Sequence, residues 1–253
     1  MKEIETRTLT INGCEIHCEL RGRGEPLLLL HGFTGCSGDW QYAGREALEN
    51  RYRLIAPDAR GHGRSTNPEP RLTHRQCARD VLALLDALGI ERCPAIGMSF
   101  GANMLLHVAT EDRDRISKMV LVSGTPYFPE QARALMRATG GEEQPREAWD
   151  AMRERHRLGD AQIAALWRAQ RAFAEDYTDV HFSPPELGLI RARTLVVYGD
   201  RDPLYPVELA LMLYRSIPRS ALAVLPNAGH GPIFRDQAAR FAELALEFLT
   251  ADD

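Results

Sequence analysis

Several features that are common in other classes of protein are missing from this sequence. It has five cysteines, an odd number, with no Cys-x-x-Cys pair and no Cys/His cluster at zinc-finger spacing. We therefore expect neither a disulfide framework nor a bound metal, and the thiols are predicted to be half-buried apolar side chains in a reducing compartment. There is no G-x-G-x-x-G turn and no G-K-[ST] phosphate loop, so no cofactor is expected.

An excess of positive charge is also missing. Lys and Arg number 31 against 35 Asp and Glu, a net charge of −4, which argues against a nucleic acid or an anionic membrane as a partner. Apolar runs such as Leu27 to Leu30 are far shorter than the ~20 residues that span a bilayer, and the charged, strand-like N-terminus does not resemble a signal peptide. These absences predict a cytoplasmic protein.

The pattern of apolar residues indicates a sheet. The 253 residues are 44% hydrophobic and contain no internal repeat, which fits one large domain or one domain with an insertion. Asn12-Gly13 joins two strand-like segments and favours the tight turn of an antiparallel hairpin. Six later apolar runs predict further strands, the first of them covered on both faces as in a parallel sheet. They lie at residues 27–31, 52–58, 93–99, 117–124, 193–200 and 221–227.

Segments of helical period lie between these runs, for example at residues 79–88 and 234–249. Alternating strands and helices predict βαβ units with right-handed crossovers. The expected fold class is therefore α/β, with a mostly parallel, doubly wound sheet opened by the antiparallel hairpin.

Residues 126–185 break this alternation. They contain three helical patterns, at 129–139, 146–158 and 160–175, and seven of the chain's 18 aromatic residues. Such an insertion between two strands suits a lid over a pocket at the carboxyl edge of the sheet, and the alternative is a subdomain that only packs on the sheet. The predicted division is a core of residues 1–125 and 186–253 with a helical lid of residues 126–185.

A candidate nucleophile lies where an apolar strand meets a helical stretch, in the Gly-Met-Ser-Phe-Gly sequence of residues 97–101. Small residues on both sides let the chain turn sharply and expose the serine hydroxyl, and the following helix directs N–H groups at an oxyanion. Ser99 is therefore the candidate nucleophile, although the pentapeptide alone would also fit an ordinary turn.

A general base is expected after the nucleophile and the acid in chain order. His230 lies on a glycine-flanked loop just past the last apolar strand, and an imidazole can take the serine proton and return it to a leaving group. The other histidines fit less well, because they lie in helical or lid segments, in the hairpin, or in loops with other roles. They are His17, His31, His62, His74, His107, His156 and His181.

Two aspartates compete for the role of the acid that orients His230. Asp202 lies in the loop, and the proline behind it fixes the turn. Asp200 is adjacent to the strand end, where it would bond nearby backbone N–H groups or Arg201. We predict that Asp202 is the acid.

The oxyanion hole is expected to consist of the backbone N–H groups of Phe33 and Phe100. Phe33 belongs to the His-Gly-Phe-Thr-Gly segment of residues 31–35, directly after the first parallel strand, and Phe100 follows the serine. His31 is expected to fix this loop.

Taken together, these segments resemble the α/β-hydrolase fold family over nearly the whole chain. The matching segments, in the family's order, are HGFTG (31–35), DARGHGRS (58–65), GMSFG (97–101), GDRDP (199–203) and NAGHG (227–231). The resemblance implies the α/β-hydrolase fold and a Ser-His-Asp triad. It also implies Asp202 as the acid, because this residue occupies the Gly-x-x-Asp position counted from Gly199.

Within the family, HGFTG followed by Trp40 resembles the menaquinone-pathway synthases, which use the same triad to eliminate pyruvate. Those enzymes usually carry an arginine directly after the Gly-Gly of the nucleophile turn, where this chain has Gly101-Ala102-Asn103. Haloalkane dehalogenases and epoxide hydrolases of the fold use an aspartate nucleophile, and Ser99 excludes that mechanism.

The sequence thus predicts a serine hydrolase of the carboxylesterase kind that acts on a small-molecule ester. A C–C hydrolase or a pyruvate-eliminating lyase would use the same triad but needs a cationic lid pocket. Alternatively, the arginines of the lid lie on helix faces that are exposed to solvent. A slow-turnover small-molecule receptor and an acyl transferase of the same fold are further alternatives. The arginines that could form such a pocket are Arg133, Arg137, Arg168 and Arg171.

Overall fold

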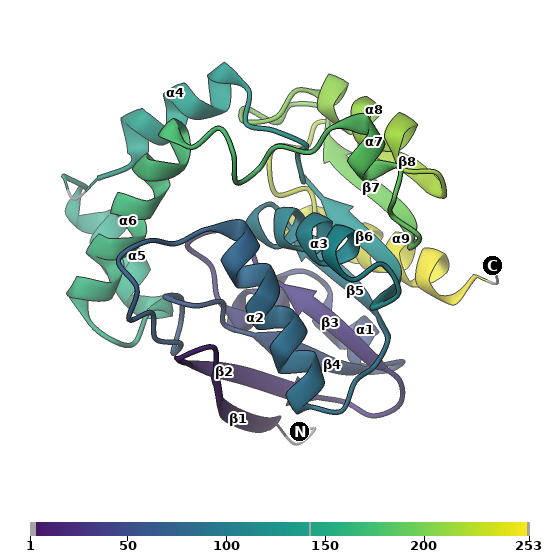
Figure 1. The fold of residues 1–253 in the computed structure, drawn as a ribbon, viewed down its shortest axis with the longest axis horizontal. Helices are drawn as coiled ribbons and strands as arrows, with labels where there is room; N and C mark the ends of the chain where they lie inside the picture. The colour runs from purple at the N-terminus through teal and green to yellow at the C-terminus, as the bar shows by residue number, and fades with distance from the viewer. Residues whose placement is uncertain (1–3, 142, 252–253) are drawn as a thin grey trace.

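The computed structural model describes residues 4–141 and 143–251, which are built around one eight-stranded sheet (Figure 1). The strand order is β1-β2-β4-β3-β5-β6-β7-β8. β2 is antiparallel to both of its neighbours, and all other neighbouring strands are parallel. The mostly parallel sheet with an antiparallel opening is therefore confirmed. The strands are β1 (Ile4–Ile11), β2 (Cys14–Arg21), β3 (Pro26–Leu30), β4 (Arg53–Pro57), β5 (Cys93–Met98), β6 (Ile116–Val122), β7 (Arg193–Gly199) and β8 (Ser220–Leu225).

The hairpin and the central strand follow the sequence pattern closely. Asn12 and Gly13 have φ angles of 47° and 78°, the two positive values that a type I′ turn requires. Along β3, Leu28 belongs to one buried apolar cluster and Leu29 to another. Because successive side chains of a strand point to opposite faces, the sheet has a core on each side.

Helices cover both faces (Figure 1). α2 (His74–Ala87), α3 (Phe100–Glu111) and α8 (Val207–Ser216) contribute to the first cluster. α1 (Arg45–Glu49) and α9 (Ala238–Thr250) contribute to the second. A 3₁₀ helix, Ser37–Tyr42, precedes α1, and another, Arg235–Gln237, precedes α9.

The segment of residues 126–185 is helical. It contains α4 (Glu130–Thr139), α5 (Arg146–Arg155) and α6 (Asp160–Glu175), and its end falls within α7 (Pro184–Leu187). The first three helices lie together beyond the carboxyl ends of the parallel strands (Figure 1). Glu142, within the predicted lid, lies outside the described residues.

The cysteines are more deeply buried than the sequence suggested. All five are free thiols; Cys14, Cys18, Cys77 and Cys93 are buried, and only Cys36 is partly accessible. Burial raises the pKa of Cys18 and of Cys93 to about 12 and that of Cys36 to about 11. At neutral pH these groups are therefore protonated thiols, which are poor nucleophiles.

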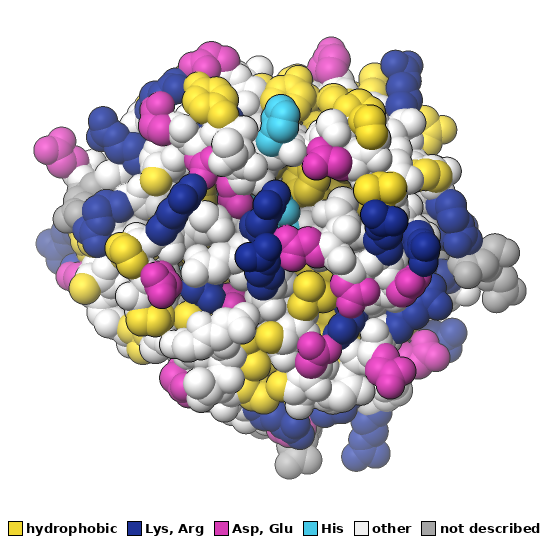
Figure 2. Space-filling model, in the orientation of Figure 1, with side chains coloured by type: hydrophobic (Ala, Val, Ile, Leu, Met, Phe, Trp, Pro, Cys, Tyr) yellow, Lys and Arg dark blue, Asp and Glu magenta, His cyan; other side chains and the backbone are white. Residues whose placement is uncertain are grey.

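The surface has no dominant sign of charge on the face shown in Figure 2, where basic and acidic side chains are interspersed. Among the helices of residues 4–141 and 143–251, none combines the length and the apolar character needed to cross a bilayer.

Candidate active site

Ser99 lies in a strained turn between β5 and α3. Its φ and ψ angles are 52° and −107°, a conformation that non-glycine residues adopt rarely. A side chain at Gly97 would collide with the backbone of Gly101, and one at Gly101 with the backbone of Leu30. Both glycines are therefore needed for the close approach of α3 to β3 and β5, which holds the serine at the carboxyl edge of the sheet.

The structure brings Ser99, His230 and Asp202 into one hydrogen-bonded series. His230 Nε2 lies 2.8 Å from Ser99 Oγ, and His230 Nδ1 lies 2.8 Å from Asp202 Oδ2. The Asp202 side chain is fully buried, whereas that of His230 is 20% exposed. Asp202 Oδ1 accepts hydrogen bonds from the backbone of Leu204 and Tyr205 at 2.8 and 3.1 Å. The carboxylate is thus fixed with one oxygen directed at the imidazole.

Asp200 has a different position. Its Oδ1 accepts from the backbone N–H of Ala228 at 3.2 Å, and so it ties the end of β7 to the loop that carries His230. Asp202 therefore contacts the imidazole of His230, whereas Asp200 bonds the backbone of the loop that carries His230.

Phe33 and Phe100, the residues predicted to supply the oxyanion N–H groups, line the same cavity as Ser99. Phe100 is the first residue of α3, so its N–H has no carbonyl of a preceding helical turn to bond. No residue in the described part of the chain accepts from the Phe33 N–H. The Phe33 loop is held by His31, which donates from Nδ1 to the Gly32 carbonyl at 2.8 Å and accepts from Ala59 N–H at 3.0 Å.

The glycine-rich segment of residues 58–65 supports this loop. Asp58 accepts from the backbone N–H groups of Ser37 and Arg64 at 2.7 and 2.8 Å. Arg60 forms a buried ion pair with Asp80 on α2. Both carboxylates therefore have protein partners, and the segment has a structural role.

His156 connects the helical segment to the loop of Phe33, a role that the sequence did not indicate. This buried residue follows α5 directly; its Nδ1 accepts from Gly63 N–H at 2.9 Å and its Nε2–H donates to the Thr34 carbonyl at 3.1 Å. In this neutral tautomer both ring nitrogens form hydrogen bonds. A proton added to Nδ1 would face the Gly63 N–H and break the first bond.

Lowering the pH from 7 to 5 is therefore expected to destabilise the fold through His156. Burial lowers the pKa of this imidazole from 6.5 to about 4, so the unfolded chain binds a proton that the folded chain excludes. The neutral His156 contributes its full stabilisation at pH values above the pKa of the imidazole in the unfolded chain. This stabilisation decreases as the pH falls towards the pKa in the folded chain. The loss between pH 7 and pH 5 is about 2 kcal/mol.

Urea unfolding of the wild type and of His156→Gln at both pH values would test this prediction. Between pH 7 and pH 5 the free energy of unfolding should fall by about 2 kcal/mol less in the variant than in the wild type. His181→Gln, a change at an exposed histidine, should behave as the wild type does. An unaltered pH dependence in His156→Gln would contradict the assignment.

A cavity of about 270 Å³ adjoins Ser99 and His230. Its walls are mainly apolar and aromatic, and within residues 4–141 and 143–251 no Lys, Arg, Asp or Glu lines it. The helical segment of residues 126–185 contributes Phe128, Leu135, Met136, Thr139, Gln170 and Phe173 to the walls.

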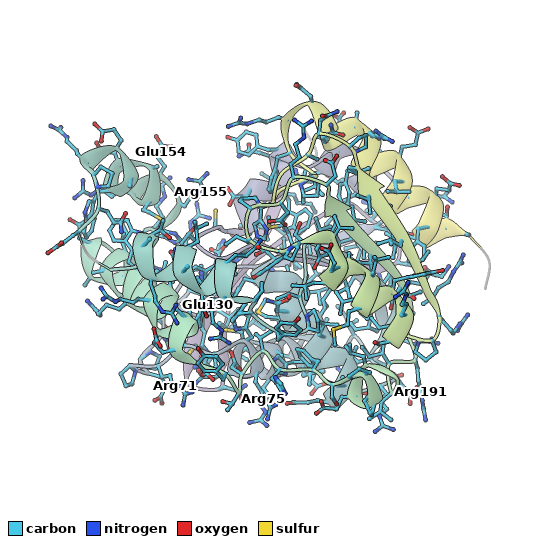
Figure 3. All side chains as sticks on the ribbon, turned by 90° about the horizontal axis from the view of Figure 1, so that it is seen from above. Arg71, Arg75, Glu130, Glu154, Arg155 and Arg191 are labelled. Atoms are coloured by element: carbon cyan, nitrogen blue, oxygen red, sulfur yellow. The ribbon has the colours of Figure 1, made fainter. Side chains whose placement is uncertain are left out.

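A second cavity of about 280 Å³ meets the first at the Phe33 loop and Met98, which line both. It contains one cation, Arg155 at the end of α5 (Figure 3), which pairs with Asp39 at 3.1 Å. The two cavities thus meet at the loop that is predicted to supply one of the oxyanion N–H groups.

The four arginines considered for a cationic lid pocket do not border the cavity beside Ser99. Arg133 is buried but donates to backbone carbonyls, among them that of Ala174 at 2.7 Å. Arg137 pairs with Glu130 and Glu175. Arg168 lines a different cavity, and Arg171 is exposed.

Two further polar residues beside the serine were not found from the sequence. The ring of Tyr205 lies 5.1 Å from that of His230, in an edge-to-face contact. Burial and the charge of Asp202 raise the pKa of the Tyr205 hydroxyl, while hydrogen bonding by Asn103 and Ser99 acts in the opposite direction. The hydroxyl therefore lies next to both side chains.

The chain is similar to known proteins in both sequence and structure. Residues 27–244 match the Alpha/beta hydrolase family. The chain is 27% identical to a pimeloyl-[acyl-carrier protein] methyl ester esterase of Nitrosomonas europaea, covering 86% of this chain and 93% of that protein. It is 29% identical to a 2-hydroxymuconate semialdehyde hydrolase of Pseudomonas putida, with coverage of 98% and 95%. The solved structure of a thermophilic esterase from Thermogutta terrifontis superposes with a TM-score of 0.77 at 27% identity, with coverage of 97% and 98%.

Proposed function

Because this chain belongs to the alpha/beta hydrolase family, we propose that it cleaves an uncharged carboxylic ester through an acyl-enzyme on Ser99. The observation that carries the proposal is the position of the Ser99–His230–Asp202 series at the edge of a cavity without charged walls among the described residues. Acyl transfer needs a nucleophile, a base held by a carboxylate, and two N–H donors for the oxyanion.

In the first half of the reaction, Ser99 Oγ attacks the ester carbonyl while His230 Nε2 takes the hydroxyl proton. The N–H groups of Phe33 and Phe100 bind the oxyanion of the tetrahedral intermediate. Collapse of the intermediate breaks the ester C–O bond, and His230 returns its proton to the departing alcohol. Asp202 stabilises the imidazolium that forms between the two proton transfers.

In the second half of the reaction, a water molecule takes the place of Ser99 as the nucleophile. His230 takes a proton from the water as its oxygen attacks the acyl carbon, and the carboxylic acid leaves as Ser99 regains its proton.

We propose that residues 126–185 act as a lid. Side chains from α4 and α6 form one wall of the cavity beside Ser99, so displacement of these helices would open it. Closure would exclude water from the acyl-enzyme until the alcohol has left.

The lining of the cavity favours an ester over the C–C hydrolase and lyase alternatives. Those reactions need a cation in the lid pocket, and the arginines considered for that role lie elsewhere or bond the lid backbone. Burying a carboxylate without a compensating cation is costly. Neutral esters therefore fit the first cavity better than carboxylate substrates.

We expect a neutral acyl ester to be hydrolysed at least about tenfold faster, in kcat/KM, than an ester of equal length that ends in a carboxylate. p-Nitrophenyl heptanoate and the mono-p-nitrophenyl ester of adipic acid form such a pair. A Ser99→Ala sample serves as the control for background hydrolysis. Faster turnover of the carboxylate ester, or cleavage of a vinylogous diketone in preference to both esters, would contradict the proposal.

A further inference from the structure

A second histidine and aspartate pair lies in the wall of the cavity beside Ser99. His74 begins α2, and its Nδ1 lies 2.7 Å from Asp179 Oδ2. Asp179 also accepts from the backbone N–H groups of His74 and Arg75 at 2.7 and 3.1 Å, so its carboxylate caps the helix. Both side chains are buried, with His74 2% and Asp179 8% exposed. The pair is separate from the Ser99–His230–Asp202 series.

Aromatic rings hold the His74 imidazole in one orientation. Its centre lies 4.6, 4.8 and 5.6 Å from those of Phe100, Phe173 and Phe128. His74 lines the cavity. Nδ1 is committed to Asp179, and no residue in the described ranges is hydrogen-bonded to Nε2. One nitrogen of a buried, immobilised imidazole is therefore available to a ligand.

We infer that His74, held by Asp179, is a polar subsite that receives a hydroxyl group of the substrate. This inference rests on the proposed function, because it assumes that the substrate ester is bound at Ser99 in the same cavity. An Asp179 carboxylate that accepts Nδ1–H fixes the tautomer in which Nε2 carries a lone pair. A lone pair accepts an O–H donor, so the chemistry of the subsite is that of a hydrogen-bond acceptor in an apolar wall.

The state of the carboxylate supports this tautomer. Burial alone would raise the pKa of Asp179, but hydrogen bonds from His74 and from the start of α2 lower it to about 2. His107, 3.9 Å from Asp179, does not neutralise it at pH 7, because burial lowers the pKa of His107 to about 4. Asp179 is therefore ionised and can accept the Nδ1–H of His74.

The balance of charge favours a hydroxyl over a carboxylate as the ligand group. A substrate carboxylate would need a protonated His74, whose charge Asp179 already balances. The described walls of the cavity offer no further cation, so the pair and the ligand together would leave one negative charge buried. A hydroxyl adds no charge and satisfies Nε2.

Asn103 offers a complementary donor in the same cavity. It is 1% exposed, and its Oδ1 accepts from Thr125 N–H at 2.9 Å. Its Nδ2 has no partner at hydrogen-bonding distance among the described residues, although it lies near enough to the Tyr205 hydroxyl to lower the pKa of that group. A hydroxyl is both donor and acceptor, so the cavity presents an acceptor at His74 and a donor at Asn103 to an oxygen-bearing chain.

The test compares pairs of esters in which a hydroxyl replaces a methyl group of similar size. One series carries the hydroxyl near, midway along and at the end of the acyl chain of a p-nitrophenyl ester. The other carries it on the alcohol of an acetate ester, so the two series distinguish the two sides of the ester bond. At the position that reaches His74, kcat/KM of the hydroxyl member should exceed that of the methyl member about 5- to 100-fold.

Two variants separate hydrogen bonding from packing. His74→Phe keeps an aromatic ring against Phe100 and Phe173 and removes Nε2, so the preference should fall to about unity. In His74→Gln the side-chain amide can donate to Asp179 while its oxygen accepts from the ligand, and part of the preference should return. His181→Phe, at an exposed site, should keep the wild-type ratio.

Binding to Ser99 provides a readout that does not depend on ester turnover. Hydroxyalkyl and alkyl boronic acids, which bond a nucleophilic serine reversibly, are compared by their Kd for the wild type. Tighter binding of a hydroxyalkyl member supports the subsite even if no ester is hydrolysed, an outcome that would contradict only the proposed function. Ratios within twofold of unity in every ester pair and every boronic acid pair would overturn the subsite.

Discussion

Replacement of Ser99 by alanine is expected to lower kcat for a neutral ester by about 10⁴- to 10⁶-fold, with the fold retained. The change removes the only oxygen that lies 2.8 Å from His230 Nε2 among the described residues. It also places a smaller residue at a turn whose backbone is already held by the Val122 carbonyl, 2.7 Å from the Ser99 N–H. His230→Ala should have an effect of the same order, because the two side chains act as one unit.

The measurement is steady-state hydrolysis of one p-nitrophenyl ester, with circular dichroism to establish that the variants are folded. An organophosphonate should label Ser99 in the wild type and no other serine. Retention of more than about a tenth of the wild-type activity by either variant would overturn the assignment of Ser99 as nucleophile and His230 as base.

Asp202→Asn is expected to lower kcat by about 10⁴-fold, the effect of the equivalent change in a serine protease. Asp202 Oδ1 accepts from two backbone N–H groups, those of Leu204 and Tyr205. An asparagine will keep its oxygen at that place and turn its NH₂ group towards His230 Nδ1. The imidazole must then accept at Nδ1 and carry its proton on Nε2, where it cannot take the proton of Ser99.

Asp200→Asn is the matched control. Among the described residues, the Asp200 carboxylate accepts one hydrogen bond, from the backbone N–H of Ala228, and an asparagine oxygen can accept the same bond. The rate should change by less than about tenfold, and the free energy of unfolding by about 1 kcal/mol or less. Both variants are assayed on one ester at a pH on the plateau of the wild-type profile. If Asp200→Asn is inactive and Asp202→Asn active, the acid has been assigned to the wrong residue.

Most of the fold could be predicted because it depends on local pattern. Each of the six apolar runs is a strand of the sheet, and the Asn12-Gly13 turn is present. The alpha/beta hydrolase fold implied by the resemblance is confirmed by the family match and by the sheet order. The three helices of the lid segment lie within a few residues of the predicted patterns. Period and turn chemistry act over a few residues and are therefore visible in the sequence.

The parts that could not be predicted depend on contacts between distant segments. His74 and Asp179 are 105 positions apart, and neither belongs to a recognisable motif, so the sequence indicates only that His74 lies in a helical segment. The same is true of His156, although it bonds Thr34 from 122 positions away. α8 was not predicted from its period, although Leu209 and Leu213 on one face of it are buried. A side chain that gains its role from tertiary packing leaves no signal in its own neighbourhood.

The depth of the native cysteines makes the protein suitable for spectroscopy of single sites. Four thiols are buried and the fifth has a pKa of about 11, so maleimide reagents will react slowly with all of them. A cysteine introduced at Ala138, which is exposed on α4 and does not line the cavity beside Ser99, would be the preferred site of labelling without removal of any native cysteine. A fluorophore there would report whether α4 changes its surroundings when a substrate analogue binds.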